Sequence, residues 1–264
     1  MEKSKKENIS IGKISELLKN APTDDGTFYG LLTIVFDSYI HKTLPQKIYN
    51  KDTYIYNFLD KTIEITTDFD KSQRVFNGIE KNIGYKALYN SYYAFLSNEE
   101  NKEIYILKYL CDGFDIGPKI NDNLTTSYVF KTINMRKRAL AECHKFKGLL
   151  RFQEISDNLC YASIHPDNNI LEPLGHHFIN RLSSINFIIH DKNRNICFVY
   201  NNKNYKIING TYINIPEFTE NEKMYQELWK MFFKTISIKE RKNPRCQMQF
   251  MPKKYWKDLI EEPD

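Results

Sequence analysis

The spacing of apolar residues predicts that the first half of the chain is mainly helical. From Phe28 to Tyr39, after an Asp/Thr start, apolar side chains recur three or four residues apart, which is the period of a buried helical face. The same period runs through 85–97 and 101–114, and through a long helix that ends at Gly148. These patterns predict a helical part that covers 24–148.

One segment of this half favours a different structure. Residues 61–67, KTIEITT, are rich in β-branched side chains and predict a strand. A helix is expected to follow, with Asp68 or Asp70 as its amino-terminal cap.

The period changes after Gly148. Residues 149–155 and 159–166 alternate around the turn SDN and predict a β-hairpin. Helical spacing returns in 170–184, where Pro173 stands close enough to the start to be tolerated. Residues 186–191 and 195–208 then predict two or three more strands. We therefore expect a small antiparallel sheet interrupted by one helix.

The last part of the chain is predicted to be helical again. Residues 219–243 have the pattern of a long amphipathic helix, and the tail 244–262 is expected to be short helix or loop anchored by Tyr255 and Trp256. The fold class is therefore α+β, with the carboxyl-terminal helices packing back. We expect a flexible, lysine-rich extension over 1–23 and a single domain over 24–264, its sheet-containing part covering 149–264.

Charge is distributed unevenly along the chain. The formal net charge is +5, yet residues 131–151 sum to +6, residues 230–257 sum to +8, and the remainder sums to −9. If the two basic segments form one face, that face would suit a polyanion such as DNA. The alternative is two solvated helix faces that never meet.

Other features exclude several classes of protein. No apolar run is long enough to span a bilayer, and the first residues do not resemble a secretory signal, so we expect a cytoplasmic protein without a membrane partner. Five cysteines without a CxxC pair favour reduced thiols and no structural zinc. The phosphate-binding glycine motifs are missing, and no cofactor is expected.

Residues 141–155, AECHKFKGLLRFQEI, combine acid, thiol, imidazole and cations. On a helix Cys143 and His144 point about 100° apart, so they do not form a nucleophile and base pair by adjacency. A buried thiol is the simpler interpretation of Cys143. The catalytic candidates are therefore Glu142, His144, His177 and Asp191.

Histidines gather between 144 and 190 and offer a metal site as an alternative. With nearby carboxylates they provide suitable ligands, but HExxH spacing is missing, and adjacent His176 and His177 cannot both point inward from one helix. Singly placed histidines that bind backbone carbonyls are the simpler interpretation, and no metal is expected.

Cations interleaved with flat side chains are the strongest pattern. Lysine and arginine neutralise phosphates, and aromatic rings stack on exposed bases. The candidate nucleic-acid-binding residues are Lys145, Arg151, Arg181, Arg194, Arg241, Arg245, Lys253, Lys254 and Trp256. The alternative is that most of the aromatic residues in these segments, Phe146, Phe152, Phe178, Phe250 and Trp256, belong to the core.

From Asp24 onward the chain resembles the bacterial "probable DNA metabolism protein" family. The matching segments are DGTFYGLLTIVFDSY, DKSQRVFNGI, AECHKFKGLLRF, YASIHPDNNILEPLGHHFINRL, FIIHDKNRNICFVY and LWKMFFKTISIKERKNPRCQMQFMPKKYW. The family pattern falls on Glu142, His144, Lys145, Phe146, Gly148, Arg151, Phe152, His177, Phe178, Arg181, Asp191, Arg194, Arg241, Asn243, Gln247, Pro252, Tyr255 and Trp256.

The resemblance implies a setting in DNA repair or base modification and implies no particular reaction. Genes of that family stand beside those for a radical S-adenosylmethionine protein resembling spore photoproduct lyase, and some members are joined to a uracil-DNA glycosylase-like domain. This chain differs by its lysine-rich extension, and we expect no glycosylase-like domain on it, so glycosylase activity is not carried over.

Three hypotheses follow. The first is a DNA-binding accessory protein that presents DNA to a radical S-adenosylmethionine or glycosylase-type partner. The second is an enzyme acting on a base or nucleotide through a pocket where the catalytic candidates and Arg181 converge. The third is a protein-binding scaffold without nucleic-acid contact.

Overall fold

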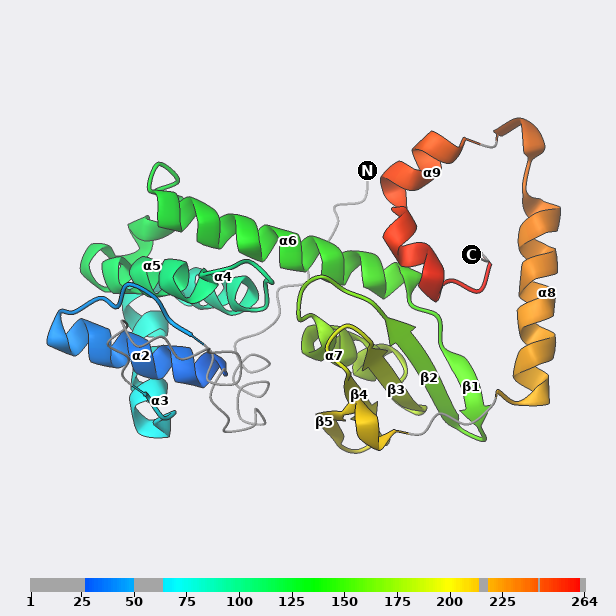
Figure 1. The fold of residues 1–264 in the computed structure, drawn as a ribbon, viewed down its shortest axis with the longest axis horizontal. Helices are drawn as coiled ribbons and strands as arrows, with labels where there is room; N and C mark the ends of the chain where they lie inside the picture. Colours follow the sequence, from blue (N-terminus) through cyan, green and yellow to red (C-terminus); the bar gives the residue numbers. More distant parts are fainter. Residues whose placement is uncertain (1–26, 50–63, 214–217, 242, 262–264) are drawn as a thin grey trace, which may run out of the picture. The chain divides into compact units, whose positions relative to one another are not determined.

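The computed structural model describes residues 27–49, 64–213, 218–241 and 243–261 (Figure 1). The chain divides into two compact units between Ala139 and Leu140. We call them the amino-terminal and the carboxyl-terminal unit and describe each by itself. The extension predicted for 1–23 lies outside the described residues. The single domain expected over 24–264 stays a prediction.

The described part of the amino-terminal unit is helical, as the apolar spacing predicts. Its elements are α2 (Phe28–His41), α3 (Phe69–Gly78), η1 (Ile79–Ile83), α4 (Tyr85–Phe95), α5 (Lys102–Ile116), η2 (Gly117–Asp122) and the first part of α6 (Ser127–Leu149). Leu32, Leu88 and Leu107 are fully buried in its core. Thr27 caps α2, and Asp68 caps α3 by accepting the backbone N–H of Lys71 at 3.0 Å.

The strand predicted over 61–67 is wrong for the residues that the structure describes. Residues 64–67 form no strand, and 61–63 lie outside the described part. The next residue, Asp68, bonds to the hydroxyl of Thr33 on α2 through both its backbone N–H (3.1 Å) and its carbonyl oxygen (3.2 Å). The backbone next to the predicted strand therefore bonds to the side chain of a helix and not to another strand. β-propensity alone does not supply a strand to pair with.

The carboxyl-terminal unit contains a five-stranded sheet in the order β1-β2-β3-β4-β5. The strands are β1 (Gln153–Ser156), β2 (Leu159–Ile164), β3 (Asn186–Asp191), β4 (Ile196–Tyr200) and β5 (Tyr205–Asn209). The predicted hairpin is confirmed, with β1 and β2 joined by a turn in which Asn158 has φ 59°. Asparagine is one of the few residues that adopts this left-handed conformation readily.

The prediction of an antiparallel sheet is wrong at its centre, because β2 and β3 are parallel, from Leu159 opposite Asn186 to Ile164 opposite Asp191. Helix α7 (Leu171–Arg181) connects these two strands (Figure 1). A helix that connects two neighbouring strands can return the chain to the starting end of the sheet, and this allows the parallel pairing. The interrupting helix is thus a crossover.

Apolar side chains from α6, α7 and the sheet make the core of the carboxyl-terminal unit. Phe146, Phe187 and Phe198 are almost fully buried in it. Gly175 of α7 lies directly over Phe198, since a Cβ at this position would stand 2.5 Å from two ring carbons. Gly175 therefore allows the helix to approach the sheet closely.

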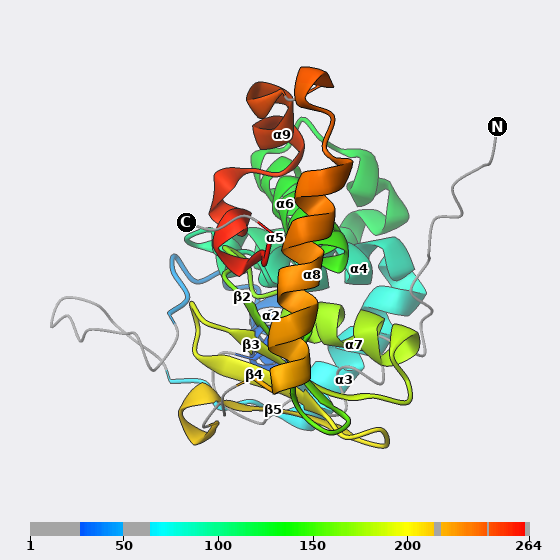
Figure 2. The ribbon, with the colours of Figure 1, turned by 90° about the vertical axis from the view of Figure 1, so that its right-hand side faces the viewer.

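The carboxyl-terminal elements differ in how far they are buried. They are α8 (Glu220–Ile236), η4 (Lys239–Arg241), α9 (Pro244–Phe250) and η5 (Lys253–Asp258). η5 packs back against β2, and Tyr255 is 2% exposed, as expected of an anchor. By contrast, α8 buries none of its residues, and Figure 2 shows it as the orange helix nearest the viewer.

Replacing Gly175 by alanine is expected to lower the free energy of unfolding by about 1–3 kcal/mol, because the added methyl group has to displace either Phe198 or the helix. Gly148→Ala is the matched control. Apart from its chain neighbours and the backbone of its own helix, no atom of the described residues lies within 4 Å of a Cβ at position 148. Alanine favours helix, so this change should leave stability the same or raise it by up to about 1 kcal/mol. Chemical denaturation measures both, and equal effects would contradict the close approach.

Candidate functional site

The loop between β2 and α7, residues 165–170, is held in place by a buried carboxylate. The Glu142 residue is 5% exposed, and its side chain projects from α6 toward the loop. Its oxygens accept hydrogen bonds from the backbone N–H of Asp167 (3.0 Å), the backbone N–H of Asn168 (2.8 Å) and the Asn168 amide (2.7 Å). These three charge-assisted hydrogen bonds compensate for the free-energy cost of burying the carboxylate.

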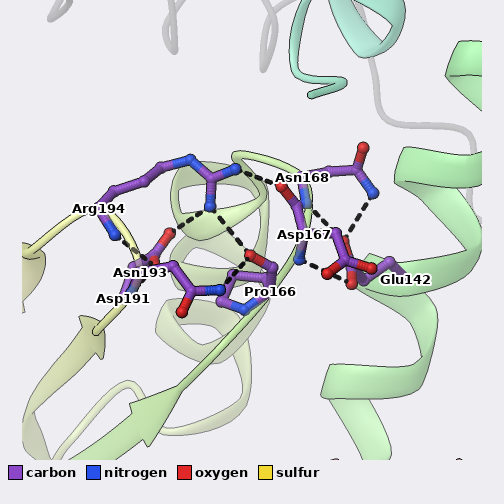
Figure 3. Close-up of polar contacts among 7 residues, drawn as sticks. All are labelled: Glu142, Pro166, Asp167, Asn168, Asp191, Asn193 and Arg194. Carbon is purple, nitrogen blue, oxygen red and sulfur yellow. Dashed lines mark hydrogen bonds and ion pairs between the residues drawn. The ribbon is translucent and has the colours of Figure 1, made fainter. Parts of the chain in front are cut away.

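A second carboxylate reaches the same loop through arginine. Asp191 ends β3 with no exposed surface, and it accepts hydrogen bonds from the backbone N–H of Asn193 and of Arg194 at 3.0 and 3.2 Å. It also pairs with the Arg194 guanidinium at 2.9 Å. That guanidinium donates to the carbonyl oxygens of Pro166, at 3.1 Å, and of Asp167. Figure 3 shows the loop lying between Glu142 on one side and Arg194 on the other.

Lys254 of η5 adds a cation to this arrangement. Its ammonium group donates to Glu142 at 3.1 Å and to the Asp167 carboxylate. Burial lowers the Lys254 pKa, but the hydrogen bonds to Asp167 and Glu142 outweigh burial, so on balance the pKa is raised. Lys254 therefore stays charged and neutralises part of a local negative charge. We call Glu142, Asp167, Asn168, Asp191, Arg194 and Lys254 the loop clamp.

The two basic segments meet where η5 packs against the carboxyl-terminal end of α6. The rings of Phe146 and Tyr255 lie 5.1 Å apart, edge to face. The ammonium groups of Lys145 and Lys254 lie over the Tyr255 ring at 5.7 and 4.9 Å. Residues more than a hundred positions apart in sequence are thus neighbours within one unit.

Arg151 links the end of α6 to the last described residue of the chain. Its guanidinium pairs with Glu261 at 2.5 Å and donates to the carbonyl oxygens of Gly148 and Leu149 at the end of α6. Burial raises the pKa of Glu261, but its hydrogen bonds, first that of Arg151, lower it on balance. The arginine thereby satisfies carbonyl groups that the helix end leaves unpaired.

The candidate cations fall into two groups. Arg151, Arg194 and Lys254 are engaged in ion pairs inside the unit. Among the described residues no ion pair joins the other candidate cations, which are Lys145, Arg181, Arg241, Arg245 and Lys253. All of these except half-buried Lys145 are exposed.

Trp256, next to Tyr255, lies beside a cation that forms no ion pair among the described residues. Its ring is half-buried, its indole N–H donates to the Met251 carbonyl oxygen at 2.9 Å, and the Lys253 ammonium lies 5.7 Å from the ring centroid. Exposed Lys257 stands in the same short helix. We call Lys145, Lys253, Trp256 and Lys257 the tail cluster.

The catalytic candidates do not all take part in the loop clamp. Glu142 and Asp191 belong to it, whereas His144 is exposed on α6 and Arg181 is exposed at the end of α7. The ring of His177 lies against that of its neighbour Phe178, with centroids 5.1 Å apart. Burial raises the pKa of the Cys143 thiol to about 11, which keeps it protonated at neutral pH and makes it a poor nucleophile.

The structure also joins residues that the sequence did not single out as a pair. The ring of His165 bonds to Asp258 through Nδ1 at 2.8 Å, and the hydroxyl of Ser163 donates to the same carboxylate oxygen at 3.4 Å. Burial raises the pKa of Asp258, and the bond from His165 opposes this rise. A spacing of 93 residues carries no signal, so only the packing of η5 on β2 reveals the pair.

Buried His190 is accounted for by its neighbours. Its Nδ1 lies 3.1 Å from the hydroxyl of Tyr161 and its Nε2 lies 3.3 Å from the side-chain oxygen of Asn195. Burial lowers its pKa, which favours a neutral ring. Within the described ranges, no three His, Cys, Asp or Glu side chains gather as metal ligands, and no helix combines the length and apolar character needed to cross a bilayer.

Comparison with known proteins assigns a family. A family model described as a domain of unknown function, DUF4130, matches residues 100–261, which is more than half of the chain. The chain belongs to the DUF4130 family. The matched range contains the whole loop clamp and the tail cluster. No curated protein and no solved structure matched this chain.

Neighbouring lysines allow a direct test of the loop clamp. Lys254→Met should lower the free energy of unfolding by about 1–2 kcal/mol, because it leaves the buried Glu142 carboxylate without its cation beside Asp167. Lys253→Met removes an exposed, unpaired charge and should change stability by less than about 0.5 kcal/mol. Urea denaturation compares them, and a Lys254 variant as stable as the Lys253 variant would contradict the clamp.

Proposed function

We propose that this DUF4130 protein binds DNA through the tail cluster and acts as an accessory protein in DNA repair or base modification. The observation that carries the proposal is the packing of η5 against α6. This contact places the ammonium groups of Lys145 and Lys254 over the same Tyr255 ring. Lys253 and Lys257 belong to η5, as Lys254 does. Lysines on η5 and at the end of α6, next to a partly exposed ring, are suited to phosphates and an unstacked base.

The pairing of the cations supports the same conclusion. Lys254, Arg151 and Arg194 hold the fold together, so their charges are already compensated. Lys253 and Lys257 form no ion pair among the described residues, so their charges can release counterions from a nucleic acid. Free cations of this kind make protein–DNA affinity depend on salt concentration.

Family membership supports the setting. DUF4130 is a family associated with uracil-DNA glycosylase. The resemblance to the "probable DNA metabolism protein" family further favours a partner that is a radical S-adenosylmethionine protein or a glycosylase. We do not propose the enzymatic alternative, because the carboxylates of Glu142 and Asp191 are already occupied by hydrogen bonds inside the loop clamp.

The DNA-binding half of the proposal is tested by charge reversal. Lys253→Glu combined with Lys257→Glu should weaken binding to a fluorescent oligonucleotide at least tenfold, and should reduce the slope of log affinity against log salt by about 2, as expected if each lysine meets one phosphate. Lys203→Glu combined with Lys206→Glu is the control, since both lysines are exposed elsewhere in the same unit. Equal losses in both variants, or none in either, would rule out the tail cluster.

The accessory half is tested with a glycosylase. Uracil excision from a uracil-containing duplex by a limiting amount of uracil-DNA glycosylase should become at least twofold faster when the unaltered protein is added. The Lys253→Glu, Lys257→Glu variant should give no acceleration, because it no longer holds the DNA. An unchanged excision rate, with DNA binding intact, would contradict the accessory role and leave the binding surface standing.

A further inference from the structure

Helix α8 exposes an unusual amount of apolar surface. It carries eight large apolar side chains, each between 37% and 64% exposed, and none of its residues is buried. Phe, Tyr and Trp side chains have roughly 150–250 Å² each, and Met, Leu and Ile somewhat less, so at about half exposure these eight present on the order of 800 Å². A single monomer rarely exposes an apolar patch of more than about 300–600 Å².

The carboxyl-terminal unit covers only part of this surface. α8 is fastened at Glu222, which accepts the backbone N–H of Glu154 at 3.0 Å, and at Trp229, whose indole donates to Glu261 at 3.1 Å. Beside these points Tyr225, Leu228, Trp229 and Phe232 line an open groove of about 470 Å³. Phe152 and Ile260 form its opposite wall.

Two methionines show that closing the groove would not bury the whole face. Met224 and Met231 are 53% and 64% exposed and do not line the groove. They lie seven residues apart, two turns of helix, and therefore on one side. This side needs a partner that comes from outside the unit.

The charges on α8 favour a partner helix whose acidic and basic halves run in the opposite order. The first half of the helix carries Glu220, Glu222 and Glu227 against Lys223, and the second half carries Lys230 and Lys234 with no acid. Surface ion pairs join Glu220 to Lys223 at 2.7 Å and Glu227 to Lys230 at 3.0 Å. Such pairs are weak, and the two halves keep net charges of opposite sign. This order also suits the helix dipole. In an antiparallel pair of identical helices it has another effect, because each acidic half faces the basic half of the other copy.

We propose that α8 is the interface through which two copies of this chain associate, their α8 helices packed antiparallel about a twofold axis. The exposed apolar area of one α8 is of the same order as the surface that each partner contributes to an interface of standard size, about 800 Å². A twofold interface requires a self-complementary surface, and the reversal of charge along α8 supplies it. The proposal is independent of DNA binding.

The first experiment measures mass without DNA. Sedimentation equilibrium of the full chain should give twice the 31.4 kDa of one copy. Met224→Glu combined with Met231→Glu should raise the dissociation constant at least tenfold, because two carboxylates from each copy would be buried at the contact. The exposed pair Lys203→Glu, Lys206→Glu is the control and should leave it unchanged. Circular dichroism checks that every variant keeps its helices.

The second experiment tests the antiparallel arrangement. One variant carries Lys230→Glu and Lys234→Glu, and another carries Glu220→Lys and Glu227→Lys. Each alone should associate at least tenfold more weakly, because like charges then face one another in both halves of the pair. An equimolar mixture should regain the original affinity, since acidic and basic halves match again in the mixed pair.

Three outcomes would overturn the proposal. The unaltered chain could stay at the mass of one copy up to about 100 μM, a concentration at which an interface of this size would form. It could form pairs that the methionine substitutions leave unchanged. Finally, mixing the two charge variants could fail to restore affinity although both variants are folded.

Discussion

The carboxyl-terminal unit depends on the need to satisfy one buried carboxylate. Glu142 sits at 5% exposure, and a charge in that position is tolerated only when donors surround it. Two backbone N–H groups, one amide and one ammonium group meet this need, and they come from the 165–170 loop and from η5. The same bonds therefore fix the start of α7, the crossover helix, and bring the end of the chain against α6.

This constraint explains why the basic residues have unequal roles. Lys254 is drawn toward Glu142 and Asp167, and Arg194 is drawn toward Asp191 and the loop carbonyl groups. Their positive charges are used to hold the fold. Lys253, one residue away, forms no ion pair among the described residues, so its charge is not used in this way. Adjacent side chains of one basic segment can thus differ in whether they hold the fold.

The two apolar anchors of the tail follow the same division. Tyr255 enters the core beside Phe146, whereas Trp256 stays half-buried with its N–H satisfied by Met251. α8 differs from both, because its hydrogen bonds with the unit are at Glu222 and Trp229 while its large apolar side chains are 37–64% exposed. One unit therefore carries the basic residues proposed above to bind DNA and the apolar helix proposed above to pair with a second copy.

The sequence by itself determined what depends on local period and local hydrogen bonds. The helix after Thr27, a cap at Asp68 or Asp70, the hairpin around Asn158 and the anchor at Tyr255 were all predictable, because spacing and capping act within a few residues. Only the tertiary structure decided the parallel pairing of β2 with β3, which depends on where α7 packs. It also decided that Glu142 and Asp191 face one loop and that His165 meets Asp258, because a contact between distant residues leaves no trace in the spacing of either.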